Sequence, residues 1–124
     1  MDGRSRPDGG RRGYDKLVDG YLSPQHRDHP EAGCGVAALA AEVARADRPA
    51  QGSYTRQVRE CLDVLADLTD SPERHVAERE AMFTLSALVG AISVARAIDD
   101  PELSRRFLTN TAAALKQRSA RSAR

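Results

Sequence analysis

Three potential metal ligands lie close together in the sequence. His26, His29 and Cys34 fall within nine residues, and His75 or Cys61 could supply the fourth ligand of a tetrahedral zinc site. Their spacing matches none of the familiar closed zinc sites. We therefore expect a solvated loop here, without a metal ion or other cofactor.

Cys34 is the leading candidate for a reactive side chain. It lies between two glycines near the start of an expected helix, a position that can favour the thiolate. No basic residue or second cysteine adjoins it, so we expect a small structural cysteine, with a thiol sensor as the alternative. The sequence holds no Gly-rich phosphate loop, nucleophile elbow or H-E-x-x-H motif. We assign no catalytic residues and do not expect an enzyme.

The composition indicates a small helical protein. With 124 residues, 4% aromatic residues and no tryptophan, the chain suits one all-α domain better than a β-sandwich or barrel. Residues 14–115 hold 11 basic and 16 acidic side chains, a net charge of −5, whereas both ends of the chain are basic. An acidic body disfavours a DNA-binding surface on it.

The two cysteines and the N-terminal sequence indicate the cellular compartment of the protein. Two unpatterned cysteines and the lack of a signal-peptide pattern predict a cytoplasmic protein. Residues 81–98 carry a single charge, but this run is shorter than the ~20 residues of a membrane span and continues directly from a charged segment. We expect a buried helix there and no membrane association.

Apolar spacing and helix-start signals predict five helices. They are expected over 14–22, 34–46, 53–69, 73–97 and from 101 onward. Ser53, Ser71 and Asp100 are the expected N-caps of the last three, with proline at the first helical position after the latter two. The expected organisation is a disordered segment over 1–13, one helical domain over 14–118 and a frayed basic tail over 119–124.

The helix over 73–97 has two apolar stripes on opposite sides. At ~100° per residue, one stripe holds Met82, Leu85, Leu88, Val89 and Ile92, and the other holds Val76, Phe83, Val94 and Ile98. Small residues, including Ala91 and Ala95, fill the sectors between them. A helix with two apolar faces needs a packing partner on each. In so short a chain, this predicts an obligate helical dimer.

Several segments together resemble the C-terminal regulatory domain of TetR-type transcriptional repressors. They are the stretch Gly20–Asp28 (GYLSPQHRD), the pair Gly33-Cys34 with the short Ala/Leu helix after it, and the strings LVGA at 88–91 and ARAIDDPEL at 95–103. The resemblance covers residues 14–116. It implies a homodimer joined by a four-helix bundle from the last two helices of each subunit, and a pocket between the middle helices for a small apolar effector.

The resemblance also implies an N-terminal helix-turn-helix that binds DNA. Only 13 Gly-, Arg- and Asp-rich residues precede Tyr14, too few for a three-helix domain, so DNA contact is expected only through a helix-turn-helix absent from this chain. The function expected is effector binding and dimerisation in a TetR-like regulator, where the effector relieves DNA binding. The alternative is a stand-alone helical dimerisation protein that could modulate a full-length relative.

Two sets of site residues follow. Candidates for ligand binding come from the first four expected helices: Tyr21, Leu39, Val43, Tyr54, Val58, Cys61, Leu65, Met82, Phe83 and Ser86. Candidates for the dimer interface are the following residues of the last two helices: Leu88, Ala91, Ile92, Ala95, Leu103, Phe107 and Asn110.

Overall fold

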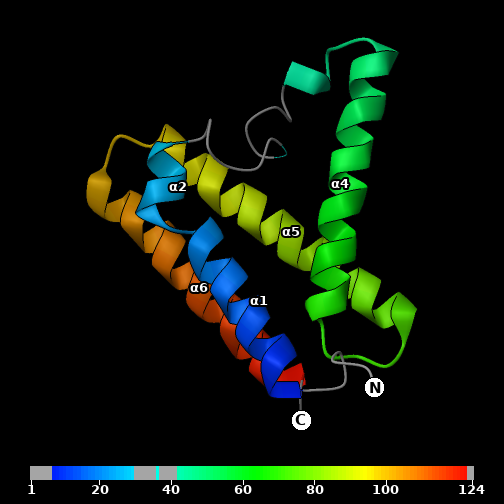
Figure 1. The fold of residues 1–124 in the computed structure, drawn as a ribbon. Helices are drawn as coiled ribbons and strands as arrows, with labels where there is room; N and C mark the ends of the chain where they lie inside the picture. The colour runs from blue at the N-terminus through cyan, green and yellow to red at the C-terminus, as the bar shows by residue number, and fades with distance from the viewer. Residues whose placement is uncertain (1–6, 30–35, 37–41, 123–124) are drawn as a thin grey trace.

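The structure, a computed structural model, describes residues 7–29, 36 and 42–122. Within them, four long helices pack together: α1 (Pro7–Tyr21), α4 (Arg48–Leu68), α5 (Arg74–Ala97) and α6 (Pro101–Ser122). The short α2 (Pro24–Asp28) packs on α5. In Figure 1, α1 and α6 lie side by side, and α4 stands across the first half of α5. The expected all-α class is confirmed as a packing of four helices, not as the five-helix bundle that we expected.

Helix α1 begins seven residues earlier than Tyr14. It therefore extends into the segment 1–13 that we expected to be disordered, and residues 1–6 lie outside the described residues. Proline fits the first turn of a helix because its fixed φ is helical and its missing N–H has no partner there. Gly13 also has a packing role: a Cβ at this position would lie 2.9 Å from Leu68 Cδ2. The glycine thus allows α1 to approach α4 closely.

Helix α4 begins at Arg48, so the expected N-cap at Ser53 is wrong. Asp47 caps the helix instead, and its Oδ1 accepts a hydrogen bond from the Ala50 N–H at 3.0 Å. Pro49 lies within the first turn, where proline costs no hydrogen bond. Gly52 lies inside the helix. The predicted helix over 34–46 falls mostly outside the described residues.

The starts of α5 and α6 show one departure and one agreement. Helix α5 begins at Arg74 after Glu73, which makes no side-chain cap hydrogen bond, so the expected Ser71 cap and the place of Pro72 at the first helical position are wrong. Helix α6 begins at Pro101 as expected. The Asp100 Oδ1 accepts hydrogen bonds from the Glu102 and Leu103 N–H groups at 3.0 and 3.1 Å.

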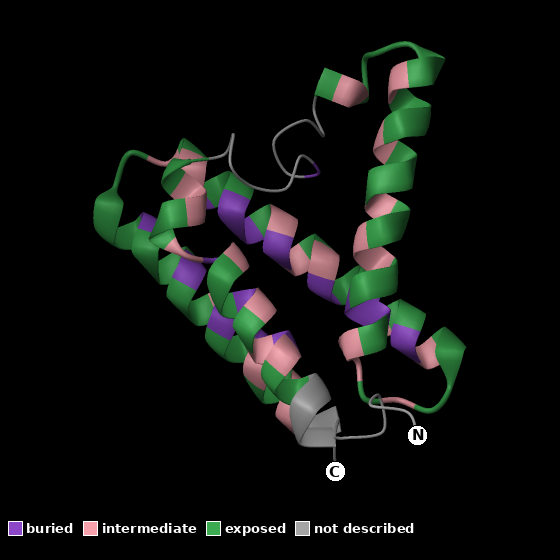
Figure 2. Ribbon diagram, in the orientation of Figure 1, coloured by how far each residue is buried: buried purple, intermediate pink, exposed green. Residues whose placement is uncertain are grey.

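The core consists of two clusters that meet on α5 (Figure 2). The larger joins α1, α5 and α6, and its fully buried side chains include Val18, Leu88, Ile92 and Leu115. The smaller joins α4 and α5 through the following residues: Leu65, Ala66, Ala77 and Ala81. Leu17 of α1 packs against both clusters.

The buried face of α5 differs from either predicted stripe. It is a row of small residues with two large ones: Ala77, Ala81, Thr84, Leu88, Ala91, Ile92 and Ala95. Met82 of the first stripe is 55% exposed, and Phe83 of the second is 48% exposed. Alanines become buried because they let neighbouring helices approach closely. By length and composition alone, α5 could cross a membrane, with 33% of its most apolar window buried in the fold.

Candidate functional site: an apolar groove between α1, α4 and α5

A groove of about 460 Å³ lies where α1, α4 and α5 meet. Among the described residues, nine line it: Leu17, Tyr21, Gln57, Glu60, Cys61, Val64, Leu65, Leu85 and Leu88. A volume of this size and a mainly apolar lining with a few polar groups are typical of small-molecule sites. The groove is therefore the strongest candidate site among the described residues.

The packing of α4 on α5 explains why a groove exists. At one end, Ala66 of α4 meets Ala77 and Ala81 of α5, and these small side chains let the helices come together closely. Farther along, the contact involves the larger Leu85 and Leu88, and the two helices diverge (Figure 1). The groove lies in this diverging region, and α1 closes its third side.

The groove has an apolar floor and a polar rim. Leu65 and Leu88 are buried, whereas Val64, Gln57 and Glu60 are exposed at the edge. Glu60 is the only carboxylate among the described lining residues, and none of them is a lysine or arginine. The groove can therefore hold an apolar body and place a polar group of the ligand near Glu60.

Three of the ten predicted ligand-binding residues line the groove: Tyr21, Cys61 and Leu65. Leu39 lies outside the described residues. The remaining six lie away from the lining: Val43, Tyr54, Val58, Met82, Phe83 and Ser86.

Two of those six have other contacts in the structure. The Tyr54 hydroxyl donates a hydrogen bond to the Val36 carbonyl at 2.7 Å. The Phe83 ring lies under the guanidinium of Arg118, at 4.4 Å, and Arg118 also pairs with Glu80 at 2.9 Å. Phe83 thus contributes to the contact between α5 and α6, not to the groove.

The exposed rim of the groove was not predicted from the sequence. Gln57, Glu60 and Val64 follow the i, i+3, i+7 spacing of a single helix face, which is also the face of Cys61. This spacing is the sequence signal that could have placed the three residues beside Cys61. None of these three residues is among the predicted ligand-binding residues, because a groove rim is exposed to solvent and carries no buried apolar pattern.

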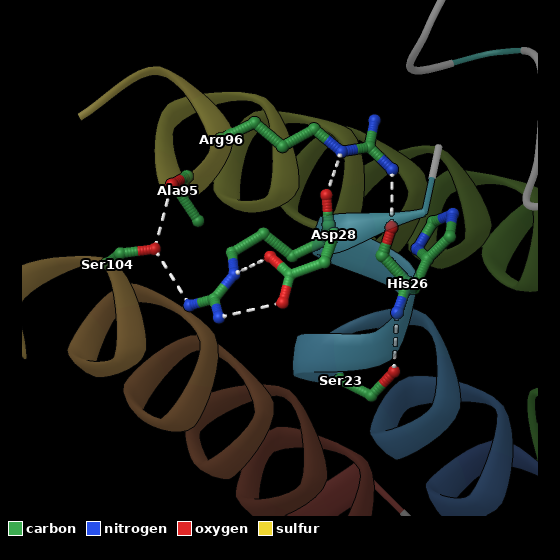
Figure 3. Close-up of polar contacts among 7 residues, drawn as sticks. Ser23, His26, Asp28, Ala95, Arg96 and Ser104 are labelled. Carbon is green, nitrogen blue, oxygen red and sulfur yellow. Dashed lines mark hydrogen bonds and ion pairs between the residues drawn. The ribbon is translucent and has the colours of Figure 1, made fainter. Parts of the chain in front are cut away.

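A polar cluster holds α2 against the end of α5 (Figure 3). Arg96 donates hydrogen bonds from Nε to the Arg27 carbonyl at 3.1 Å and from Nη2 to the His26 carbonyl at 2.8 Å. Arg27 in turn donates to the Ser104 Oγ at 3.0 Å, and the Ser104 hydroxyl donates to the Ala95 carbonyl at 2.7 Å. The Arg27 guanidinium also lowers the pKa of the Asp28 carboxyl. This cluster fixes the segment that follows α1.

The candidate metal ligands are not brought together within the described residues, which hold no group of three side chains able to bind a metal ion. The His26 Nδ1 lies 2.6 Å from the Tyr21 carbonyl, and its ring packs edge-on against the Tyr21 ring. His26 is thus part of the turn between α1 and α2. Cys34, the candidate sensor thiol, lies outside the described residues.

Four of the seven predicted dimer residues are buried in the chain's own core: Leu88, Ala91, Ile92 and Ala95. There they pack with residues of α1 and α6, so the dimer surface proposed below does not include them. The other three are exposed on α6: Leu103, Phe107 and Asn110.

Exposed apolar side chains do gather along α5 and α6. Phe83 and Val94 are eleven residues apart on α5, and Phe107 and Arg118 are eleven apart on α6, a spacing of about three turns. Because Phe83 contacts Arg118, Val94 and Phe107 lie on the same side of the helix pair. We call Phe83, Val94, Leu103 and Phe107 the α5/α6 strip; all four are exposed.

The chain was compared with known proteins. No family model, curated protein or solved structure matches it. The fold itself therefore supports only the broader assignment, a small all-helical domain, and function rests on the groove and the α5/α6 strip.

Proposed function

We propose that this chain is the effector-binding and dimerisation domain of a TetR-like transcriptional regulator. The observation that carries the proposal is the apolar groove between α1, α4 and α5. Its volume of about 460 Å³ suits a small apolar effector. DNA contact would come from a separate helix-turn-helix, because the described residues hold 16 basic and 16 acidic side chains and therefore carry no net positive charge.

Dimerisation in this proposal uses the α5/α6 strip. Two copies that pair through the strip would form a four-helix bundle from α5 and α6 of each. The strip places two side chains of each helix on one side of the pair, and an exposed apolar surface of this kind is typical of an interaction site. Helix α5 would then serve the groove on one side and the dimer on the other.

Effector binding would act through α1, which contributes Leu17 and Tyr21 to the groove. A ligand shifts a conformational equilibrium only when it binds one state better than the other. Leu17 also packs against both core clusters, so a ligand that displaces its side chain changes how α1 sits on α4 and α5. In an intact regulator, α1 would transmit this conformational change to the DNA-binding domain.

Titration of the neutral fluorescent probe N-phenyl-1-naphthylamine tests the groove. The wild-type chain should bind the probe, and Val64→Trp should abolish binding because the indole fills the groove from an exposed lining position. Arg59→Trp, on the same helix but away from the lining, is the matched control and should bind normally. Equal probe binding by all three proteins would refute the groove as the site.

Sedimentation over a dilution series tests the dimer. The wild-type chain should be dimeric, and Phe107→Glu should shift it to a folded monomer. Thr109→Glu introduces the same charge on the other flank of α6 and should leave the dimer intact. A monomeric wild-type chain would refute the proposed pairing of the α5/α6 strip.

The strip also favours a second candidate, a helical dimerisation protein without an effector. The two experiments separate it from the first proposal. A chain that dimerises through Phe107, binds no probe and behaves identically as Val64→Trp would support this second function.

A further inference from the structure

The groove carries a charge preference in addition to its apolar character. We infer that it takes a lipophilic cation, with the positive group placed at the rim beside Glu60. This inference rests on the proposed function of the groove as an effector site. It names the class of effector.

The lining residues supply the first argument. Glu60 is the one carboxylate among those described, Gln57 lies one turn away with an amide oxygen that can accept a hydrogen bond, and no lysine or arginine takes part. Arg59 lies on the opposite side of α4 from Cys61, at roughly 160° around the helix. Arg56 donates to the Ser53 Oγ at 3.4 Å and does not line the groove.

The apolar lining supplies the second argument. The described residues hold 16 basic and 16 acidic side chains, so the net charge of the helices favours neither sign of ligand. A ligand of either sign gains the same apolar contact with Leu17, Leu85 and Leu88. The Glu60 carboxylate at the rim then decides between the two signs.

Exposure limits the size of the Glu60 contribution. Glu60 is exposed, and a solvent-screened ion pair at such a site changes affinity by about two- to five-fold. The preference should weaken with added salt, because screening shortens the range of the interaction to ~8 Å at physiological ionic strength. The apolar contribution should be much less sensitive to salt.

The experiment compares two ions of the same shape and opposite charge, tetraphenylphosphonium and tetraphenylborate, with neutral triphenylphosphine oxide as the uncharged reference. Binding is measured by calorimetry on the full chain at constant ionic strength. The cation should bind more tightly than the anion. Glu60→Gln should weaken tetraphenylphosphonium binding about two- to five-fold and leave triphenylphosphine oxide unchanged.

Asp63→Asn is the matched control. It removes the same charge from the same helix, one turn further along, where the Asp63 carboxylate pairs with Arg74 at 3.3 Å and lies outside the groove lining. It should change tetraphenylphosphonium affinity less than Glu60→Gln does. Gln57→Glu should strengthen cation binding, because it adds a second carboxylate to the rim.

The possible results separate this inference from the proposed function. If the neutral compound binds and Val64→Trp abolishes that binding, but the anion binds as tightly as the cation, the charge preference is refuted while the groove function stands. If Asp63→Asn weakens cation binding as much as Glu60→Gln does, the role of Glu60 is refuted. If neither the neutral compound nor either ion binds, both the inference and the groove function fall.

Discussion

A buried hydrogen bond between α1 and α5 gives the sharpest test of the packing. The Tyr14 and Thr84 hydroxyls lie 2.9 Å apart, and the two residues are only 5% and 3% exposed. Tyr14→Phe removes one hydroxyl and leaves the other buried without this partner, which typically costs ~1–3 kcal/mol. A cavity of about 30 Å³ lined by both residues can admit one water molecule. This places the expected cost near the lower end of that range.

A double-mutant cycle isolates the interaction. Tyr14→Phe and Thr84→Val should each destabilise the chain, while the double variant should cost less than the sum because it leaves no unpaired hydroxyl behind. We expect a coupling free energy of about 1 kcal/mol, measured by urea unfolding followed by circular dichroism. A double variant whose cost equals the sum of the single costs would refute the hydrogen bond.

The same tyrosine predicts a pH dependence. Burial raises the pKa of Tyr14 above its ordinary value of 10.0, against the smaller opposing effect of the Thr84 hydrogen bond. The unfolded chain therefore loses this proton at a lower pH than the folded chain does. The contribution of Tyr14 to stability is complete below pH 10 and decreases as the pH rises beyond it. The difference in unfolding free energy between wild type and Tyr14→Phe should shrink over that range, and a constant difference up to pH 11 would contradict the assignment.

Three further changes test the ends and interiors of the helices. Arg96→Lys should lower the free energy of unfolding by about 1–2 kcal/mol and speed amide exchange of His29. The reason is that one ammonium group cannot replace both guanidinium hydrogen bonds to the carbonyls of α2. Arg79→Lys, on the exposed side of α5, is the control. Asp47→Ala should cost about 1 kcal/mol in thermal or urea unfolding, whereas Ser53→Ala should cost clearly less. Gly52→Ala should stabilise the chain by up to ~1 kcal/mol, because nothing lies within 4 Å of the new Cβ and the site is an exposed helix interior; a lower melting temperature would contradict this.

The sequence predicted the junction between α5 and α6 but not the buried face of α5. Helix α5 ends at Ala97 and α6 begins at Pro101 as expected, because cap and proline signals act locally. The buried face of α5 was not predictable from the bulk of its side chains. Ala77 and Ala81 are buried because α4 approaches there, and only the packed fold determines where two helices touch.

The groove was partly predictable for a similar reason. Cys61 and Leu65 lie on the apolar face of α4, which the sequence periodicity identifies, so both were found. Glu60 and Gln57 were missed because periodicity separates buried from exposed positions but does not recognise a rim. Asp47 and Ser53 show the limit of a local signal. Both residue types can cap a helix; Ser53 was predicted as the cap, whereas Asp47 caps α4 in the structure.

The packing also indicates which helix an effector would move. Both ends of α5 are fixed, the first by the close alanine contact with α4 and the second by the hydrogen bonds of Arg96 and Ser104. Helix α1 has fewer polar links to its neighbours among the described contacts, chiefly the Tyr14–Thr84 hydrogen bond and an exposed pair between Asp19 and Lys116 at 2.8 Å. An exposed pair of this kind contributes at most ~1 kcal/mol. Under the proposed function, a ligand in the groove therefore shifts α1 relative to α5, which stays in place. The residues of the α5/α6 strip on α5 keep their positions while α1 moves.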